Sequence, residues 1–107
     1  MRSAPGSGMG EDHRPWVLEG FLDRLDAWIS LESPDQDVIL VVTAWILTRY
    51  DDPYQGVRRE PGFPNLWYGK VPLTTDRSGR VVACAYFIEE GRRMLRCDSF
   101  ATLNLPL

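Results

Sequence analysis

The chain has little of what metal- and nucleotide-dependent enzymes commonly use. Its 107 residues contain one histidine, His13, and two cysteines, Cys84 and Cys97. His13 lies in a polar N-terminal segment, so a Ser/His/Asp or Cys/His catalytic set and a histidine-based metal site have no plausible constellation. The sequence also lacks a G-x-G-x-x-G, P-loop or C-x-x-C motif. We therefore expect no metal and no other cofactor.

Long apolar runs are also missing. No run approaches the roughly 18 to 20 residues that a membrane-spanning helix needs, and residues 1–13 lack the apolar core of a signal peptide. Those residues are rich in Gly, Ser, Pro and charge, which predicts a disordered tail. Residues 14–107 are expected to form a single α+β domain in the cytoplasm, without membrane contact.

Charge is distributed unevenly along the chain. Residues 1–53 carry four arginines against ten carboxylates, whereas residues 54–107 carry seven arginines and one lysine against five carboxylates. The two halves therefore face different partners, or face each other. The acidic overall balance argues against an ordinary nucleic-acid-binding domain but permits a local basic face in the second half.

The first half of the sequence predicts two helices. After Pro15, apolar residues recur every three or four positions, which predicts an amphipathic helix over residues 16–30. The stretch SPDQ that begins at Ser33 matches a capping box with Ser33 as the N-cap, so a second helix is expected over residues 35–50. Residues 38–48 are apolar enough for a buried strand as well, but the start signal and the length favour a helix.

The second half changes to a period of two and predicts strands at residues 66–74, 80–88 and 93–100. Pro72 cannot donate a ladder hydrogen bond, so the first of these strands is expected at an edge, or bulged there. The predicted fold class is α+β, with two N-terminal helices packed on one face of a three-stranded antiparallel β-meander (α-α-β-β-β).

The register of the hairpin formed by residues 80–88 and 93–100 predicts where the two cysteines lie relative to each other. With Glu90 and Gly91 as a two-residue turn, Cys84 lies directly opposite Cys97 on the helix-covered face. That position is near enough for a disulfide, but a reducing cytoplasm favours two unbridged buried thiols. The same register places Arg96 on the other, solvated face.

A candidate site follows from this solvated face and from residues 49–68, RYDDPYQGVRREPGFPNLWY, which connect the second helix to the first strand. Clustered cations can bind phosphates and stabilise charge during strand cleavage, and aromatic rings can stack on bases. The candidates are Arg96 on the face, Lys70 and Arg80 at its rim, Arg58 and Arg59 from the connection, and Trp67 and Tyr68 as the rings. The alternative is an ordinary sheet surface whose arginines pair with Glu60, Glu89 and Asp98.

The order of elements and motifs resembles the RelE/ParE superfamily of bacterial toxins over residues 16–103. Two helices precede a connection of the form "DP…G…R", then "NLWYGKV", then "GRVVACAYFI" and a last short strand. The resemblance implies the toxin of a toxin–antitoxin pair, with a cognate antitoxin as partner. In the ribosome-dependent mRNA interferases of the family, basic residues on the central strands and a C-terminal aromatic or histidine act on the mRNA. Lys70, Arg80 and Arg96 would correspond to the catalytic residues, and Phe100 lies near the place of the aromatic.

The chain departs from this pattern in its acidic balance, in the absence of Tyr or His after the last strand, and in a polar tail where the family has a strand before the first helix. Three functions stay open. The first is a ribosome-dependent mRNA interferase, which is our working prediction. The second is a non-catalytic toxin that binds a protein, as the ParE branch binds gyrase. The third is an accessory interaction module whose aromatics Tyr54, Phe63 and Trp67 form the docking surface.

Overall fold

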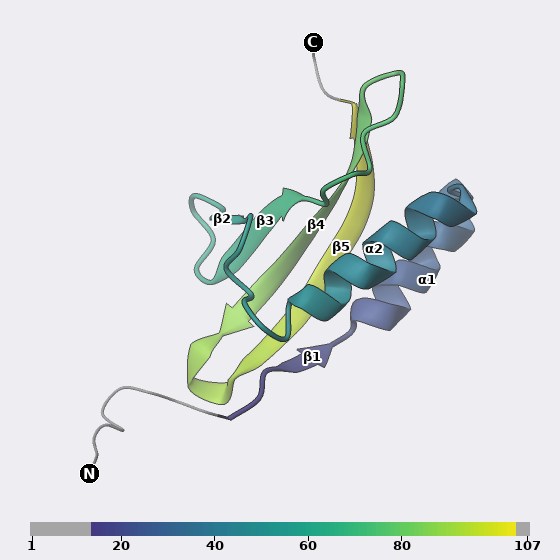
Figure 1. The fold of residues 1–107 in the computed structure, drawn as a ribbon. Coiled ribbons are helices and arrows are strands. Elements are labelled where there is room, and N and C mark those ends of the chain that lie inside the picture. The colour runs from purple at the N-terminus through teal and green to yellow at the C-terminus, as the bar shows by residue number, and fades with distance from the viewer. Residues whose placement is uncertain (1–13, 105–107) are drawn as a thin grey trace.

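The computed structural model describes residues 14–104, which form two helices and a five-stranded sheet (Figure 1). The elements in chain order are β1 (Val17–Glu19), α1 (Phe21–Glu32), α2 (Gln36–Thr48), β2 (Arg58–Arg59), β3 (Leu66–Lys70), β4 (Arg80–Glu89), a short 3-10 helix (Glu90–Arg92) and β5 (Met94–Asn104). The strand order is β1-β5-β4-β3-β2. β1 joins β5 in parallel, and the other neighbours pair antiparallel.

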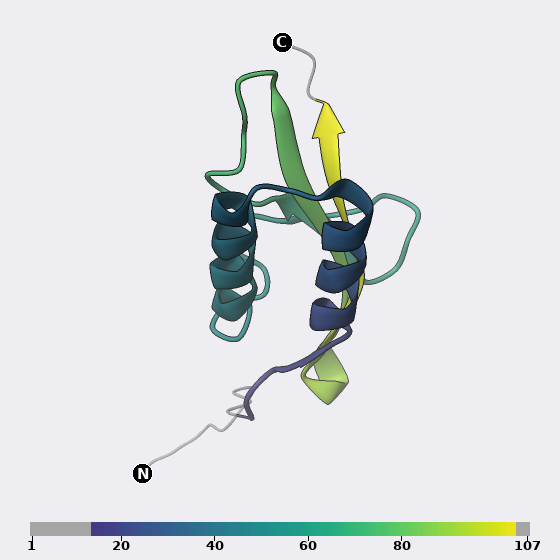
Figure 2. The same ribbon diagram turned by 90° about the vertical axis from the view of Figure 1, so that its right-hand side faces the viewer.

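Both helices stand on the same side of the sheet, and its other side is left uncovered (Figure 2). The α+β class is therefore confirmed, and the predicted meander is present as β3-β4-β5. The sheet has two further strands that the prediction omitted. The tail predicted over residues 1–13 lies outside the described residues. Within residues 14–104, neither helix has the length and apolar character needed to cross a membrane.

β1 corrects the predicted start of the first helix. Residues 17–19 were expected to be helical, but they form a strand in register with residues 94–96 of β5. Gly20 has a φ of 79°, a left-handed conformation that ends the strand and lets α1 begin at Phe21. A strand of this length is too short to show an alternating pattern. A strand therefore precedes the first helix, where only a polar tail was expected from the sequence.

α2 confirms the prediction of a helix for residues 38–48, but its cap differs from the prediction. Ser33 is the C-cap of α1, with a φ of 47° and its N–H donating to the carbonyl of Ile29 at 2.9 Å. Asp35 is the N-cap of α2 and makes no side-chain capping bond. The short linker between the helices leaves Ser33 to end one helix and Asp35 to begin the next.

The register of the β4–β5 hairpin also differs from the prediction. Cys84 pairs with Phe100 and Tyr86 pairs with Cys97, with a bulge between residues 85 and 86. The turn is longer than two residues because the 3-10 helix is followed by Arg93 at a φ of 50°. Each of these features shifts the partners along the strand. Both cysteines are free and buried.

The core fills the space between the helices and the covered face of the sheet. Aromatic side chains make much of it: the ring of Trp28 lies 6.4 Å from that of Phe100, and the ring of Trp45 lies 6.3 Å from that of Tyr86. β3 ends at Lys70 instead of residue 74, since Pro72 has no N–H to donate and Leu73 adopts a φ of 67°.

Candidate functional site

The uncovered side of the sheet, called the open face below, holds a hollow at its β3 edge. Alternation along the strands places Tyr68 and Lys70 on this face, because their partners Ala85 and Ala83 alternate with the buried Cys84. The hollow has a volume of about 440 Å³ and is called the open-face hollow; its lining is Gly56, Arg58, Tyr68, Gly69, Lys70, Ala83 and Leu103.

Small residues explain why the open face is concave there. Ala83 lies between Lys70 on one side and Ala101 on the other, and Ala85 lies between Tyr68 and a serine of β5. Of these small residues, Ala83 is in the lining of the hollow and presents only a methyl group there, while longer side chains stand at the β3 edge.

The residues between α2 and β3, called the crossover below (49–65), reach the hollow through a close backbone approach. A Cβ at Gly69 would meet the carbonyl oxygen of Gly56 at 2.5 Å, so glycine is required where the crossover passes over β3. The chain then turns into β2, where Arg58 pairs with Tyr68. This pairing delivers the Arg58 guanidinium to the same side of the sheet as the Tyr68 ring.

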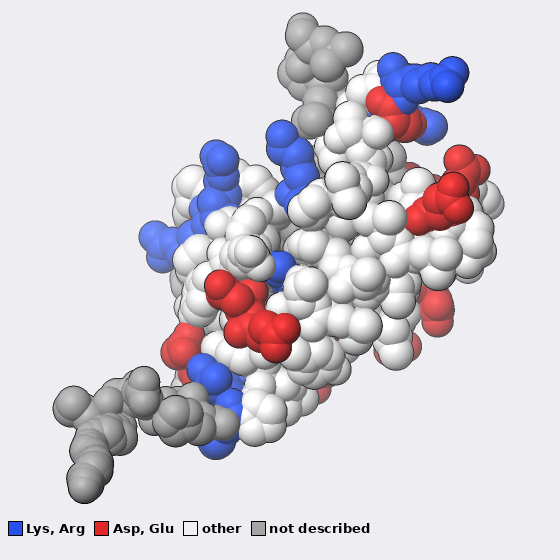
Figure 3. Space-filling view, viewed as in Figure 1, with Lys and Arg blue, Asp and Glu red and all other residues white. Residues whose placement is uncertain are grey.

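The chemistry of the open-face hollow suits a phosphate and a base. Arg58 and Lys70 are exposed cations, and no Asp or Glu is among the lining residues. Within residues 14–104 neither cation makes an ion pair. Tyr68 is half-buried, which leaves part of its ring available for stacking. Figure 3 shows basic side chains gathered over β2 and β3 on the left, with carboxylates over the helices on the right and also below the basic group, left of centre.

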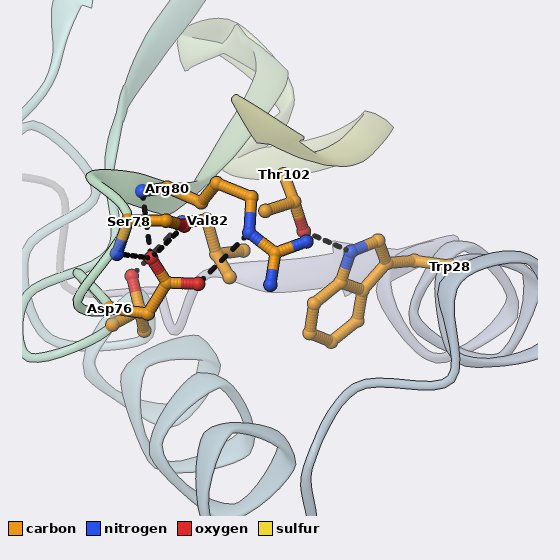
Figure 4. A network of polar contacts seen from close by, with 7 residues as sticks. Trp28, Asp76, Ser78, Arg80, Val82 and Thr102 are labelled. Carbon is orange, nitrogen blue, oxygen red and sulfur yellow. Dashed lines mark hydrogen bonds and ion pairs between the residues drawn. The ribbon is translucent and has the colours of Figure 1, made fainter. Parts of the chain in front are cut away.

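Arg80 lies outside this cluster, contrary to the prediction. Arg80 is an even number of residues from Cys84 and Tyr86 along β4, so its side chain lies on the same, helix-covered side of the sheet. There it lines a separate hollow with Trp28. Its Nε contacts Asp76 Oδ2 at 2.9 Å (Figure 4). Hydrogen bonds from the Arg80 backbone N–H and the Ser78 hydroxyl hold the pKa of Asp76 well below its usual range. Arg80 therefore braces the turn before β4.

Arg96 is on the open face but away from the hollow. Its strand partner is Phe87, and its guanidinium lies 4.5 Å from the centre of that ring and 3.5 Å from Glu89 Oε2. Lys70 pairs with Ala83 of β4, and Arg96 pairs with Phe87 of the same strand. Four residues of extended chain separate these two positions by about 13 Å along the strand. One small ligand group cannot contact both.

The remaining candidates lie in other places. Phe100 is 8% exposed and belongs to the core, because the bulge in the hairpin turns it toward the helices. Trp67 faces the covered side and packs its ring 5.0 Å from that of Tyr54. Arg59 is exposed opposite Trp67. Of the predicted residues, the structure thus brings together Arg58, Tyr68 and Lys70.

Sequence reasoning missed two contributors to this region. The first is Ala83, the small residue of β4 in the lining of the hollow, for which the alternation in "VACAYF" was the available signal. The second is Arg49, which is 2% exposed and holds the crossover by donating a hydrogen bond to the carbonyl of Gln55. In the part of the chain that the structure describes, no cluster of three or more His, Cys, Asp or Glu side chains could hold a metal ion.

Comparison with known proteins identifies the fold. No family model matches the chain, and no curated protein matches its sequence. Among solved structures, the chain is similar to a double arginine-to-alanine mutant of the E. coli toxin RelE in the free state. The identity is 11%, the match covers 82% of this chain and 83% of that chain, and the TM-score is 0.57.

The protein therefore has a RelE-like fold, as the resemblance of its motifs predicted. At this level of identity the similarity concerns the arrangement of the backbone, and what the chain does has to be argued from its own site.

Proposed function

We propose that this protein is a RelE-like toxin, the toxin component of a toxin–antitoxin pair, and that it acts on messenger RNA in the ribosome as an mRNA interferase. The observation that carries the proposal is the convergence of Arg58, Tyr68 and Lys70 on one hollow of the open face. The similarity of fold to a RelE toxin supports it.

Each of the three side chains has a role in this proposal. Arg58 and Lys70 bind phosphates of a single-stranded RNA and stabilise the charge that develops on one of them as the strand is cut. Tyr68 stacks on a base, which is worth about 1 to 3 kcal/mol in single-strand binding sites. The Lys70 ammonium and the Tyr68 phenol are the lining groups that can exchange a proton with the substrate.

The test is expression in a bacterial host, with growth rate and the integrity of translated messages as readouts. The intact protein should arrest growth and produce cuts in messages that are being translated. The double variant Arg58→Ala/Lys70→Ala should relieve both effects at equal protein level. Arg80→Ala is the matched control, because Arg80 lies on the covered side of the sheet. If the intact protein neither slows growth nor alters translation, the proposal fails.

A non-catalytic protein-binding toxin, or an accessory module, is the second candidate. Leu22 on α1, Leu47 on α2 and Tyr50 just after the end of α2 are exposed large apolar residues, and they line a hollow of about 270 Å³. This surface is a further candidate docking site beside the crossover, where Tyr54 and Trp67 pack against each other and Phe63 is exposed. A cognate antitoxin, or a target such as gyrase, would bind there.

Introducing charge on the helices separates this candidate from the first. If a protein target is the cause, Leu22→Asp/Leu47→Asp should abolish toxicity, and the intact protein should cut no RNA in a purified translation system. A change in DNA supercoiling in cells that express the intact protein would favour gyrase as that target.

A further inference from the structure

Arg49 is a cation in the interior of the protein. It follows the last residue of α2, is 2% exposed, and holds its guanidinium 4.3 Å from the centre of the Trp45 ring. Buried charges in proteins are normally paired with an opposite charge. Among residues 14–104, however, no carboxylate lies within ion-pair distance of Arg49.

The hydrogen bonds of Arg49 all go to neutral acceptors. Nη1 donates to the carbonyl of Gln55 at 2.8 Å and to the Tyr86 hydroxyl at 3.0 Å. Nε and Nη2 both donate to Thr48 Oγ1, at 3.2 and 3.0 Å. A guanidinium has more N–H donors than these bonds use, so Nη2 keeps an N–H without an acceptor in the described part of the chain. The Trp45 ring and the carbonyl end of α2 offset part of the charge, but they supply no anion.

A second hollow lies next to Arg49. It has a volume of about 340 Å³ and is called the edge hollow; its lining is Trp45, Thr48, Arg49, Gln55, Gly56, Lys70 and Pro72. It lies on the helix side of the β3 edge, between the end of α2 and the crossover, and shares Gly56 and Lys70 with the open-face hollow. No Asp or Glu lines it. One water takes about 30 Å³ of liquid volume, so the space admits a phosphate group.

We propose that the edge hollow is a binding site for a phosphate group, which supplies the counter-charge that Arg49 lacks. Lys70 is the second cation of this site. The phosphate comes either from the free ion or from the backbone of a nucleic acid that passes over the β3 edge. The site lies on the other side of that edge from the open-face hollow, so it stands whether or not the protein is an RNA-cutting toxin.

The first experiment is an NMR titration of the full chain with inorganic phosphate, against chloride at matched ionic strength. The Trp45 indole N–H and the Arg49 Nε–H signals should shift and saturate, while the indole of Trp28, which lines a different hollow, should not. Arg49→Gln should weaken the binding by about tenfold or more, since it removes a charged hydrogen-bond donor. Arg58→Gln is the control, because Arg58 lines only the open-face hollow.

The expected weakening can also be measured in Lys70→Gln, which keeps the proposal testable if Arg49→Gln does not fold. A short single-stranded oligoribonucleotide then identifies the source. Movement of the Trp45 indole by the oligonucleotide, reversed by excess phosphate, assigns the site to a phosphodiester; movement by inorganic phosphate alone assigns it to the free ion. The proposal is overturned if phosphate moves the Trp45 and Arg49 signals no more than chloride does, or if Arg49→Gln binds phosphate as tightly as the intact protein.

Discussion

The hydroxyl of Tyr86 accepts a hydrogen bond from Arg49 Nη1 at 3.0 Å, which joins the centre of β4 to the end of α2. The same hydroxyl donates to the carbonyl of Pro53, so one phenol also fixes the start of the crossover. Tyr86 is fully buried, and burial raises the pKa of its phenol. These contacts make the hydroxyl a junction between sheet, helix and crossover.

Tyr86→Phe should therefore destabilise the protein by about 1 to 3 kcal/mol, because it leaves a buried carbonyl and a buried guanidinium N–H unsatisfied while the ring still fills its space. Chemical denaturation should show a lower midpoint at an unchanged slope. Tyr68→Phe is the matched control, since Tyr68 stands half-buried on the open face. Equal midpoints for the two variants would contradict the role of the Tyr86 hydroxyl.

Tyr54 makes the stability of the protein depend on pH in the alkaline range. Its phenol donates to the Glu90 carboxylate, and partial burial followed by this bond raises the pKa of Tyr54 to about 12. An unfolded tyrosine deprotonates near pH ~10, so the stabilisation is fully present below that pH and is lost as the pH rises toward about 12. Tyr54→Phe should show a shallower loss of stability above pH ~10 than the intact protein in denaturant titrations at successive pH values. An identical alkaline profile would exclude Tyr54 as the source; Tyr50→Phe controls for loss of a surface phenol.

Ser33 offers a stabilising substitution. Its φ of 47° is in the left-handed region, where a side chain is strained and glycine is not. Ser33→Gly should raise the free energy of unfolding by roughly 0.5 to 1 kcal/mol. Ser30→Gly, in the exposed last part of α1, should lower it by about the same amount, because glycine is unfavourable inside a helix. A loss of stability in Ser33→Gly would show that the serine side chain acts as the N-cap of α2 after all.

The two cations of the open-face hollow predict how the affinity for RNA depends on salt concentration. If Arg58 and Lys70 each contact one phosphate of a single-stranded RNA, then replacing either by alanine should lower the slope of log affinity against log salt by about 0.7. Fluorescence anisotropy with a labelled oligoribonucleotide at several salt concentrations measures this slope. Arg77→Ala removes the same charge from an exposed turn and should leave the slope unchanged.

The sequence predicted the long, regular elements well. The periodicity of α1 and α2 and the alternation of β3, β4 and β5 are strong signals because each runs over several turns or pleats. β1 and β2 carry no such signal, since they have three and two residues and exist because a neighbouring strand is available to pair with them. Their positions depend on contacts far along the chain, which local pattern does not encode.

The site was predicted in part for a related reason. Arg58, Tyr68 and Lys70 were recognised as an aromatic and basic group, and the structure brings them together. Arg80 was expected at the rim of the open face, although a period of two already places its side chain on the same side of β4 as Cys84, which the sequence placed under the helices. Phe100 depended on the hairpin register, and a bulge together with a longer turn cannot be counted from sequence alone.

The parallel pairing of β1 with β5 has a consequence for synthesis. Val17 pairs with Met94, so the two meet only after the long segment between them has been made. During translation the N-terminal strand must wait while β5 is still inside the ribosomal exit tunnel, and contacts between such distant segments form slowly. The sheet, with the hollow on its open face, therefore lacks its β1 edge until β5 has left the exit tunnel.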